Sequence, residues 1–351
     1  MDPHTFVLMS GGRSSGGGPL PPATGDLLKW PRRGATIAQC LIDVRWDIDE
    51  WASMLGSIFG GNGLTQVNVL SAPWPEMEPF MENPFVRALS DGTWDIRTPN
   101  PKFYDRLVRL IDVMNRNGVL VQLCFLELYS WSGRKTGLPF DQNMTYARRN
   151  VNDVVWGPGD ETLDILPDDF AIELVERVVT AVKGSAYAIV PFNEGPEKRV
   201  HQDIAAMARR VDPNAQIVYN RNEDTPWQYA NMIKQSGERI CYHAWDTLAF
   251  LDVDFPEEPP DRPRTFRQFF DKRDRSGHPI DVDFSRTVCS SDGSRSSSDP
   301  VNTYNWPRLL EVFDFVANKG GSIEHQSRAK MSDGARLDMV EVDFLKQIAA
   351  L

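Results

Sequence analysis

The chain has 351 residues, of which 41% are hydrophobic and 25% charged, a balance typical of a globular protein with material for a large core. Its formal net charge of −11 argues against a protein that binds nucleic acid through the phosphate backbone, which requires clustered lysine and arginine. No apolar run approaches the roughly 20 residues needed to cross a bilayer. We therefore expect neither nucleic acid nor a membrane as a partner, whereas a neutral polymer such as an oligo- or polysaccharide is compatible with the charge.

The amino-terminal residues differ in composition from the rest of the chain. Residues 10–25 are rich in Gly, Ser and Pro, which is typical of a flexible arm. Residues 1–20 lack a basic start, and their only apolar patch is Phe6–Met9, so no secretion signal is expected. We divide the chain into an arm and lead-in, residues 1–34, and one domain, residues 35–351. The expected location is the cytoplasm or an assembled particle, which the arm would join.

After the arm, short β-branched runs alternate with longer amphipathic stretches, the pattern of a parallel sheet with crossover helices. The predicted strands are Thr36–Val44, Leu64–Leu70, Val119–Leu126, Ala186–Phe192, Gln216–Tyr219, Arg239–His243, His278–Phe284 and Ser322–His325. The predicted helices begin near Asp47, Pro101, Pro167, Pro196, Pro226, Thr265, Trp306 and Met339. Eight strands with helices between them predict an α/β fold, a single-domain (β/α)₈ TIM barrel. An open doubly wound sheet is the alternative, but no Gly-x-Gly-x-x-Gly follows the first strand.

The four cysteines, Cys40, Cys124, Cys241 and Cys289, are far apart and lie in or beside β-like apolar runs. They form no CxxC or Cys/His spacing of the kind that binds metal. We interpret them as small buried hydrophobic residues rather than disulfides or ligands, which indicates a reducing compartment.

Chemistry in a TIM barrel lies at the carboxyl ends of the strands. Carboxylates, amides and indoles dominate those ends here: Asp43, Trp74, Glu127, Asn193, Glu194, Asn220, Asn222, His243, Trp245, Asp246, Asp283 or Asp292, and Glu324. Such groups suit the cleavage of a glycosidic bond, in which one carboxyl group protonates the leaving oxygen and another attacks or activates water. The loop-like tryptophans (Trp74, Trp94, Trp131, Trp156) either cap the core or present an indole face to a pyranose.

Several blocks of the sequence resemble one family. Asn83-Pro84-Phe85-Val86-Arg87, Trp94-Asp95-Ile96, Asn100–Leu107 and Asn117–Val121 resemble the second-to-third strand region of cellulase-type (clan A, family 5-like) glycoside hydrolases. Leu138-Pro139-Phe140, Arg149–Asn152 and Trp156 resemble the segment after the third strand, and Val190–Glu197 resembles the strand-four signature that contains Asn-Glu-Pro. The resemblance covers roughly residues 35–330 and implies the barrel fold and glycoside hydrolysis.

The resemblance implies that Glu194 is the general acid/base and that Asn193 hydrogen-bonds the sugar 2-hydroxyl. A Glu at a barrel mouth beside apolar groups can have its pKa raised enough to remain protonated near neutral pH. The competing interpretation is that Glu194 caps the helix that begins at Pro196. His243 either lines the pocket or is an ordinary wall residue. We expect Glu127, Trp74, Trp131, Trp156 and Trp245 to line the substrate cleft, and no metal or other cofactor.

The second carboxylate is where the sequence departs from the family, whose nucleophile is a Glu that closes strand seven. The matching segment, Val288–Gly293, carries Ser291 at that position and Asp292 one residue later. A strand at Pro279–Phe284 would make Asp283 the candidate instead. Glu324, predicted on strand eight opposite strand four, would give the wider ~6.5–9.5 Å separation of an inverting pair rather than the ~5–5.5 Å of a retaining pair.

The leading hypothesis is a glycoside hydrolase that cleaves a polysaccharide by a two-carboxylate mechanism, with Glu194 as the acid and Asp292 or Glu324 as its partner. The alternative is a catalytically degenerate barrel that binds carbohydrate or serves as a structural component of a larger assembly, for example a phage virion. The arm, the absence of a secretion signal and the altered strand-seven segment favour that alternative. A third hypothesis is another barrel hydrolase or lyase.

Overall fold

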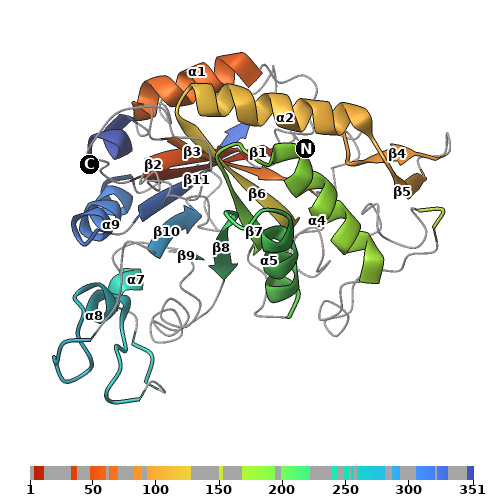
Figure 1. The fold of residues 1–351 in the computed structure, drawn as a ribbon. Helices are drawn as coiled ribbons and strands as arrows, with labels where there is room; N and C mark the ends of the chain where they lie inside the picture. Colours follow the sequence, from red (N-terminus) through yellow and green to blue (C-terminus); the bar gives the residue numbers. More distant parts are fainter. Residues whose placement is uncertain are drawn as a thin grey trace.

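A nine-stranded sheet organises the chain (Figure 1). This computed structural model describes residues 4–11, 33–37, 48–60, 63–69, 82–88, 93–127, 150–152, 168–193, 199–221, 239–243, 249–252, 254–256, 259–280, 287–292, 306–320, 322–330 and 346–351. Seven strands run parallel in chain order: β3 (Gly63–Asn68), β6 (Val119–Glu127), β7 (Tyr187–Asn193), β8 (Gln216–Arg221), β9 (Arg239–His243), β10 (Thr287–Asp292) and β11 (Ser322–Lys330).

Two further strands extend this order at β11. β1 (His4–Gly11) pairs antiparallel with β11, and β2 (Arg33–Ile37) pairs antiparallel with β1. β2 also contacts β3, so the two ends of the strand order lie against each other.

Helices lie outside the sheet (Figure 1). Their bounds are α1 (Ile48–Phe59), α2 (Pro101–Arg116), α4 (Asp168–Val182), α5 (Arg199–Val211), α7 (Ala249–Asp252), α8 (Phe266–Phe270) and α9 (Trp306–Asn318). α2 begins where the sequence requires it to: the Asn100 side chain accepts a hydrogen bond from the Lys102 backbone N–H, and Pro101 occupies a first-turn position that needs no donor. Among the described residues, no helix is long and apolar enough to span a membrane.

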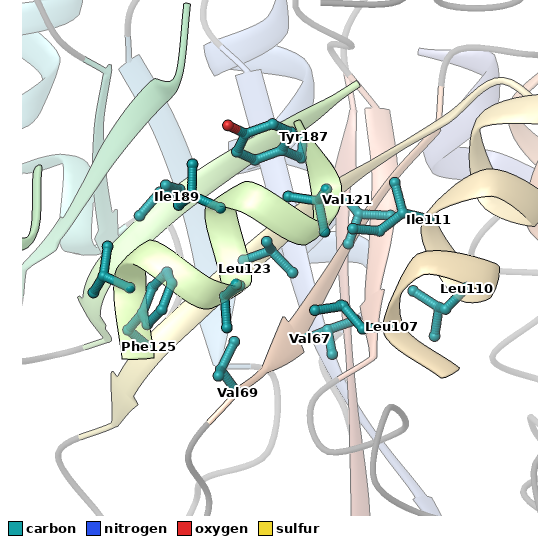
Figure 2. Packing of buried hydrophobic residues seen from close by; sticks show 14 of the residues in the cluster. Val67, Val69, Leu107, Leu110, Ile111, Val121, Leu123, Phe125, Tyr187 and Ile189 are labelled. Carbon is teal, nitrogen blue, oxygen red and sulfur yellow. The ribbon is translucent and has the colours of Figure 1, made fainter. Parts of the chain in front are cut away.

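Alternation along the strands separates two buried layers. Val121, Leu123 and Phe125 of β6 join the large cluster between sheet and helices, whereas Leu120 and Cys124 join a smaller cluster on the other face. Figure 2 shows the large cluster, with Val67 and Val69 of the β3 region, Leu107, Leu110 and Ile111 of α2, and Ile189 of β7. The smaller cluster consists of Leu64, Leu120, Cys124, Ala186, Ala188, Val190 and Val218. β3, β6, β7 and β8 therefore bury apolar side chains on both faces, as expected for parallel strands that are covered on both sides.

Several predicted elements are confirmed, with β6, β7, β8, β9 and α9 within two residues of the expected bounds. The expected start of the seventh strand at His278 is wrong, because His278–Ile280 follow α8 with an isolated bridge between Arg273 and Pro279. The strand is β10, which begins nine residues further along and overlaps the other segment considered, Val288–Gly293. The capping box of Thr265 and Gln268 starts α8, but the helix ends at Phe270 rather than near Arg275.

The strand β1 was not predicted, since Gly-rich sequence follows it. The predicted helix at Pro226 and the candidate Asp283 lie outside the described residues. Cys124 is buried as a reduced thiol, as expected for a small hydrophobic residue.

One polar pair joins the large cluster to the α5–β8 turn. The Tyr187 hydroxyl donates to Asp212 Oδ2 over 2.7 Å, and Asp212, only 2% exposed, accepts a second bond from the Asn214 backbone N–H. Burial, and then the neighbouring Asp212 carboxylate, raise the pKa of Tyr187 well above its usual value. Burial also raises the pKa of Tyr104, to about 12.

The raised pKa values of Tyr187 and Tyr104 predict that the protein loses stability at alkaline pH. Because their pKa values are higher in the folded than in the unfolded chain, the folded state retains its protons longer, and the free energy of unfolding falls as the pH rises above about 10. We expect Tyr187→Phe to lower the free energy of unfolding at pH 7 by about 1–3 kcal/mol and to flatten that alkaline fall, leaving the contribution of Tyr104. Urea unfolding at pH 7, 9 and 10.5 measures both effects, and an unchanged slope would contradict the assignment.

Candidate active site

The carboxyl ends of the parallel strands meet at one edge of the sheet. Asn193 ends β7 and is the register partner of Glu127, which ends β6. His243 ends β9, and Asp292 ends β10. The structure thus brings these four sequence-predicted residues to the same edge, the edge at which α/β folds place their sites.

A second relationship comes from the strand register. Ser290 of β10 pairs with His243 on one side and with Glu324 on the other. These three residues therefore occupy one row across β9, β10 and β11. Asp292 lies two positions further along β10, opposite Gln326.

The remaining predicted site residues are Glu194, Trp74, Trp131, Trp156 and Trp245, and all of them lie outside the described residues. Trp94 lies within them and is 4% exposed in the core, so the interpretation of this indole as a core cap is confirmed.

Two long connections, which we call excursions, leave the carboxyl ends of β3 and β6 and are hydrogen-bonded to each other. The first, between β3 and α2, contains the hairpin of β4 (Phe85–Arg87) and β5 (Trp94–Pro99), which lies beside the first turn of α2 in Figure 1. The second connects β6 to α4 and contains residues 150–152. Trp94 pairs with Asn150 in a parallel bridge, and the Val151 backbone N–H donates to the Trp94 carbonyl over 2.9 Å.

The side chain of Asn152 completes this junction. Its Oδ1 accepts from the Ile96 backbone N–H at 2.8 Å, and its Nδ2 donates to Asp95 Oδ1 at 3.0 Å. The Asn150 side chain in turn accepts from the Asn152 backbone N–H at 3.1 Å. We call Trp94, Asp95, Ile96, Asn150 and Asn152 the excursion clamp.

The carboxylate of the clamp is held in its charged form. The Thr98 hydroxyl donates to Asp95 Oδ2 at 2.6 Å, and Asn152 and the Arg97 backbone N–H donate to Oδ1. The Thr98 bond, followed by the Asn152 bond, lowers the pKa of Asp95 below its usual range. Sequence reasoning included Asp95 and Asn152 only as members of matching blocks and assigned them no role, because their contact joins positions 57 residues apart.

No group of three or more His, Cys, Asp or Glu side chains that could hold a metal ion occurs within the described part of the chain.

The fold was compared with known proteins. No protein-family model matches the sequence, and no curated protein matches it either. Among solved structures, a glycoside hydrolase family 5 mannosidase from Rhizomucor miehei superposes with a TM-score of 0.52 at 13% identity, over 93% of both chains. A point mutant of that mannosidase gives 0.51 at 12% identity, over 93% of this chain and 94% of the other. A family 5 xyloglucanase from Paenibacillus pabuli gives only 0.48 at 11% identity, over 86% and 88%.

The likeness extends over nearly the whole length of both chains, although few residues are identical. It therefore concerns the fold. This protein has a fold like that of the family 5 glycoside hydrolases.

Proposed function

We propose that the protein is a glycoside hydrolase that cleaves a polysaccharide with two carboxylates, Glu194 and Asp292. The observation that carries this proposal is the gathering of Asn193, Glu127, His243 and Asp292 at the carboxyl edge of a parallel sheet in a family 5-like fold.

The proposal includes a closed (β/α)₈ barrel formed by residues 35–351 together with the start of β2. Once β1 is set aside, β2, β3 and β6 to β11 are eight strands in chain order. β2 and β3 stand at opposite ends of the hydrogen-bonded order of the sheet, and the contact between them supports closure.

Register supports an inward position for Glu194. On β7, Ala188 and Val190 belong to the inner cluster, while Tyr187 and Ile189 belong to the helix-facing cluster. If this alternation continues past the end of the strand, Glu194 shares the face of Val190. We propose that Glu194 there donates the proton to the leaving oxygen, since a carboxyl group in apolar surroundings keeps its proton at higher pH.

The same register ranks the two candidate partners. The described pairings connect Ile189 of β7 with Ile217 of β8, and His243 of β9 with Ser290 and Glu324. Our proposal extends the β7–β8 register by five residues, which would give Glu194 the row of His243, Ser290 and Glu324. Strands of a closed barrel are tilted relative to the barrel axis because of their right-handed twist. In an eight-stranded barrel with a shear of 8, residues at the same height along the axis therefore lie about one residue closer to the carboxyl end on each successive strand.

This shift along the strands favours Asp292 over Glu324 as the partner of Glu194. β10 is three strands after β7, so the level of Glu194 on β10 lies about three residues beyond Ser290, within one residue of Asp292. β11 is four strands after β7, so Glu324 lies about four residues, or ~13 Å, deeper in the barrel. We assign Asp292 as the partner carboxylate and Glu324 as a residue of the barrel interior.

Asn193 would hydrogen-bond the sugar 2-hydroxyl, and Glu127 and His243 would line the cleft. Trp74, Trp131, Trp156 and Trp245 would stack against sugar rings, since an indole offers a large apolar face with a polar edge.

Glu194→Gln tests the function. The amide cannot donate a carboxylic proton, so we expect hydrolysis to fall by about 10²–10⁴-fold while the affinity for the same glycan is retained. The measurement is reducing-end release from a panel of β-linked polysaccharides, with binding followed by affinity electrophoresis. Glu311→Gln, the same change on the exposed face of α9, is the matched control and should hydrolyse like the wild type.

Two outcomes would overturn the proposal. Full activity in Glu194→Gln would remove this residue from the chemistry. Binding of glycans by the wild type without turnover of any of them would show a carbohydrate-binding protein instead of a hydrolase.

A further inference from the structure

The excursion clamp carries a consequence for substrate binding. It joins two segments that leave the sheet from neighbouring strands, β3 and β6, at their carboxyl ends. Residues 150–152 contact the hairpin near the middle of the β6–α4 connection, which in sequence runs from 128 to 167. Trp131 lies in sequence before this contact and Trp156 lies after it.

The backbone bridge of the excursion clamp is buried, and polar side chains lie beside it. Trp94 and Asn150 are 4% and 5% exposed, so the backbone bridge between them is shielded from water. The Asn152 amide accepts from the Ile96 backbone N–H through Oδ1 and donates to Asp95 through Nδ2. A hydrophobic or shorter side chain would replace neither bond, and the Ile96 N–H would lose its acceptor.

The opposite edge of the clamp is anchored to the body of the fold. The Asn100 side chain, which caps α2, donates to Glu82 Oε2 at 2.8 Å and to the Asn83 carbonyl at 2.9 Å. Arg97 forms an ion pair with Glu173 of α4, and Arg177 donates to the Arg97 carbonyl. The hairpin is thus hydrogen-bonded to the start of α2 and makes exposed contacts with α4, and Asn152 links residues 150–152 to it.

We propose that Asn152 is a positioning residue for the substrate: through Asp95 and Ile96 it holds residues 150–152 against the β4–β5 hairpin, and this junction borders the polysaccharide cleft proposed at the carboxyl ends of β3 and β6. This inference rests on the proposed function. Asn152 touches no reacting atom, so its loss should weaken binding of the ground state and transition state equally and raise KM with little change in kcat.

The test compares Asn152→Ala with a matched amide elsewhere. Asn115 also bridges two elements through three hydrogen bonds: its Nδ2 donates to the Val119 and Ala186 carbonyls, and its Oδ1 accepts from the Ala186 N–H. It lies at the amino ends of β6 and β7, the edge away from the proposed cleft. We expect Asn152→Ala to raise KM about tenfold with kcat nearly unchanged, and Asn115→Ala to lower stability without a change in KM.

Asn152→Asp gives a pH signature that a general loss of packing would not give. The new carboxylate can still accept from Ile96, but it faces Asp95 and repels it at neutral pH. Protonation of one of the two at acidic pH restores a donor between them. The KM of Asn152→Asp, divided by that of the wild type at the same pH, should therefore fall as the pH drops from 7 to 4.5.

Hydrogen exchange separates failure of this inference from failure of the proposed function. The Val151 N–H bonds the Trp94 carbonyl and is not itself altered by the substitution, so its exchange should accelerate in Asn152→Ala and not in Asn115→Ala. Unchanged Val151 exchange would overturn the clamp whatever the substrate. Faster exchange with an unchanged KM, in a wild type that hydrolyses glycans, would overturn its role in binding. A wild type that neither binds nor cleaves glycans would overturn the proposed function, and with it that role.

Discussion

On the proposed function, we expect Asp292→Asn to lower kcat for glycan hydrolysis by about 10²–10⁴-fold while glycan binding persists. The reason is the position of Asp292 at the end of β10, two residues past the row of His243, Ser290 and Glu324. In the proposed barrel, that offset would bring Asp292 to the level proposed for Glu194, three strands away. An amide can neither attack the anomeric carbon nor take a proton from water, so the chemistry would lose its second group.

Glu324→Gln is the discriminating variant for this assignment. In the proposed barrel, Glu324 would lie about four residues below the level of Glu194, toward the amino end of β11. We therefore expect the kcat of Glu324→Gln to be within a fewfold of that of the wild type. Reducing-end assays of the two variants, with folding verified by circular dichroism, provide the comparison. Inactivity of Glu324→Gln beside an active Asp292→Asn would reverse the assignment and point to a pair on opposite strands.

The length of the Asp292 side chain also bears on the stereochemical course. Asp is one methylene shorter than the Glu that closes strand seven in the resembling family, so the gap to Glu194 should be wider than the ~5–5.5 Å of a retaining pair. A wider gap leaves room for a water molecule, and inversion at the anomeric carbon is then the expected course. Proton NMR of the first anomer released records the outcome directly.

Phe125→Ala will produce the largest loss of stability among the substitutions considered, about 3–5 kcal/mol. Phe125 lies on the helix-facing side of β6, is 1% exposed, and belongs to the same buried cluster as Leu123 and Ile189, labelled with it in Figure 2. Truncation removes most of an aromatic ring from a close-packed layer and leaves a cavity that the sheet cannot close.

Val108→Ala is the control for this loss. Val108 lies on α2 with 42% of its surface exposed, so its truncation should change the free energy of unfolding by no more than about 0.5 kcal/mol. Urea unfolding of both variants gives the difference. Equal destabilisation by the two substitutions would mean that the layer between sheet and helices is not the tightly packed core described above.

The hydrophobic pattern by itself determined most of the fold. Continuous apolar runs such as Val119–Leu126 and Ala186–Phe192 are strands in the structure because both of their faces are buried, one against the helices and one against the inner cluster. Local signals fixed helix starts in the same way, as with the Asn100 cap before Pro101. The Asn193-Glu194 pair directly follows such a run in the sequence.

Only the tertiary structure decided the relations between distant segments. The sequence left strand seven open between Pro279–Phe284, which alternates apolar and acidic residues, and a more polar segment that begins at Val288. Only the pairing of Thr287–Asp292 with β9 and β11 selects the second. β1 was missed because its stability as a strand comes from β11 and β2 rather than from its own composition. The contact of Asn152 with Asp95 spans 57 residues, and no local pattern encodes it. Periodicity reports which side of an element is buried, whereas register and long-range hydrogen bonds depend on which elements become neighbours.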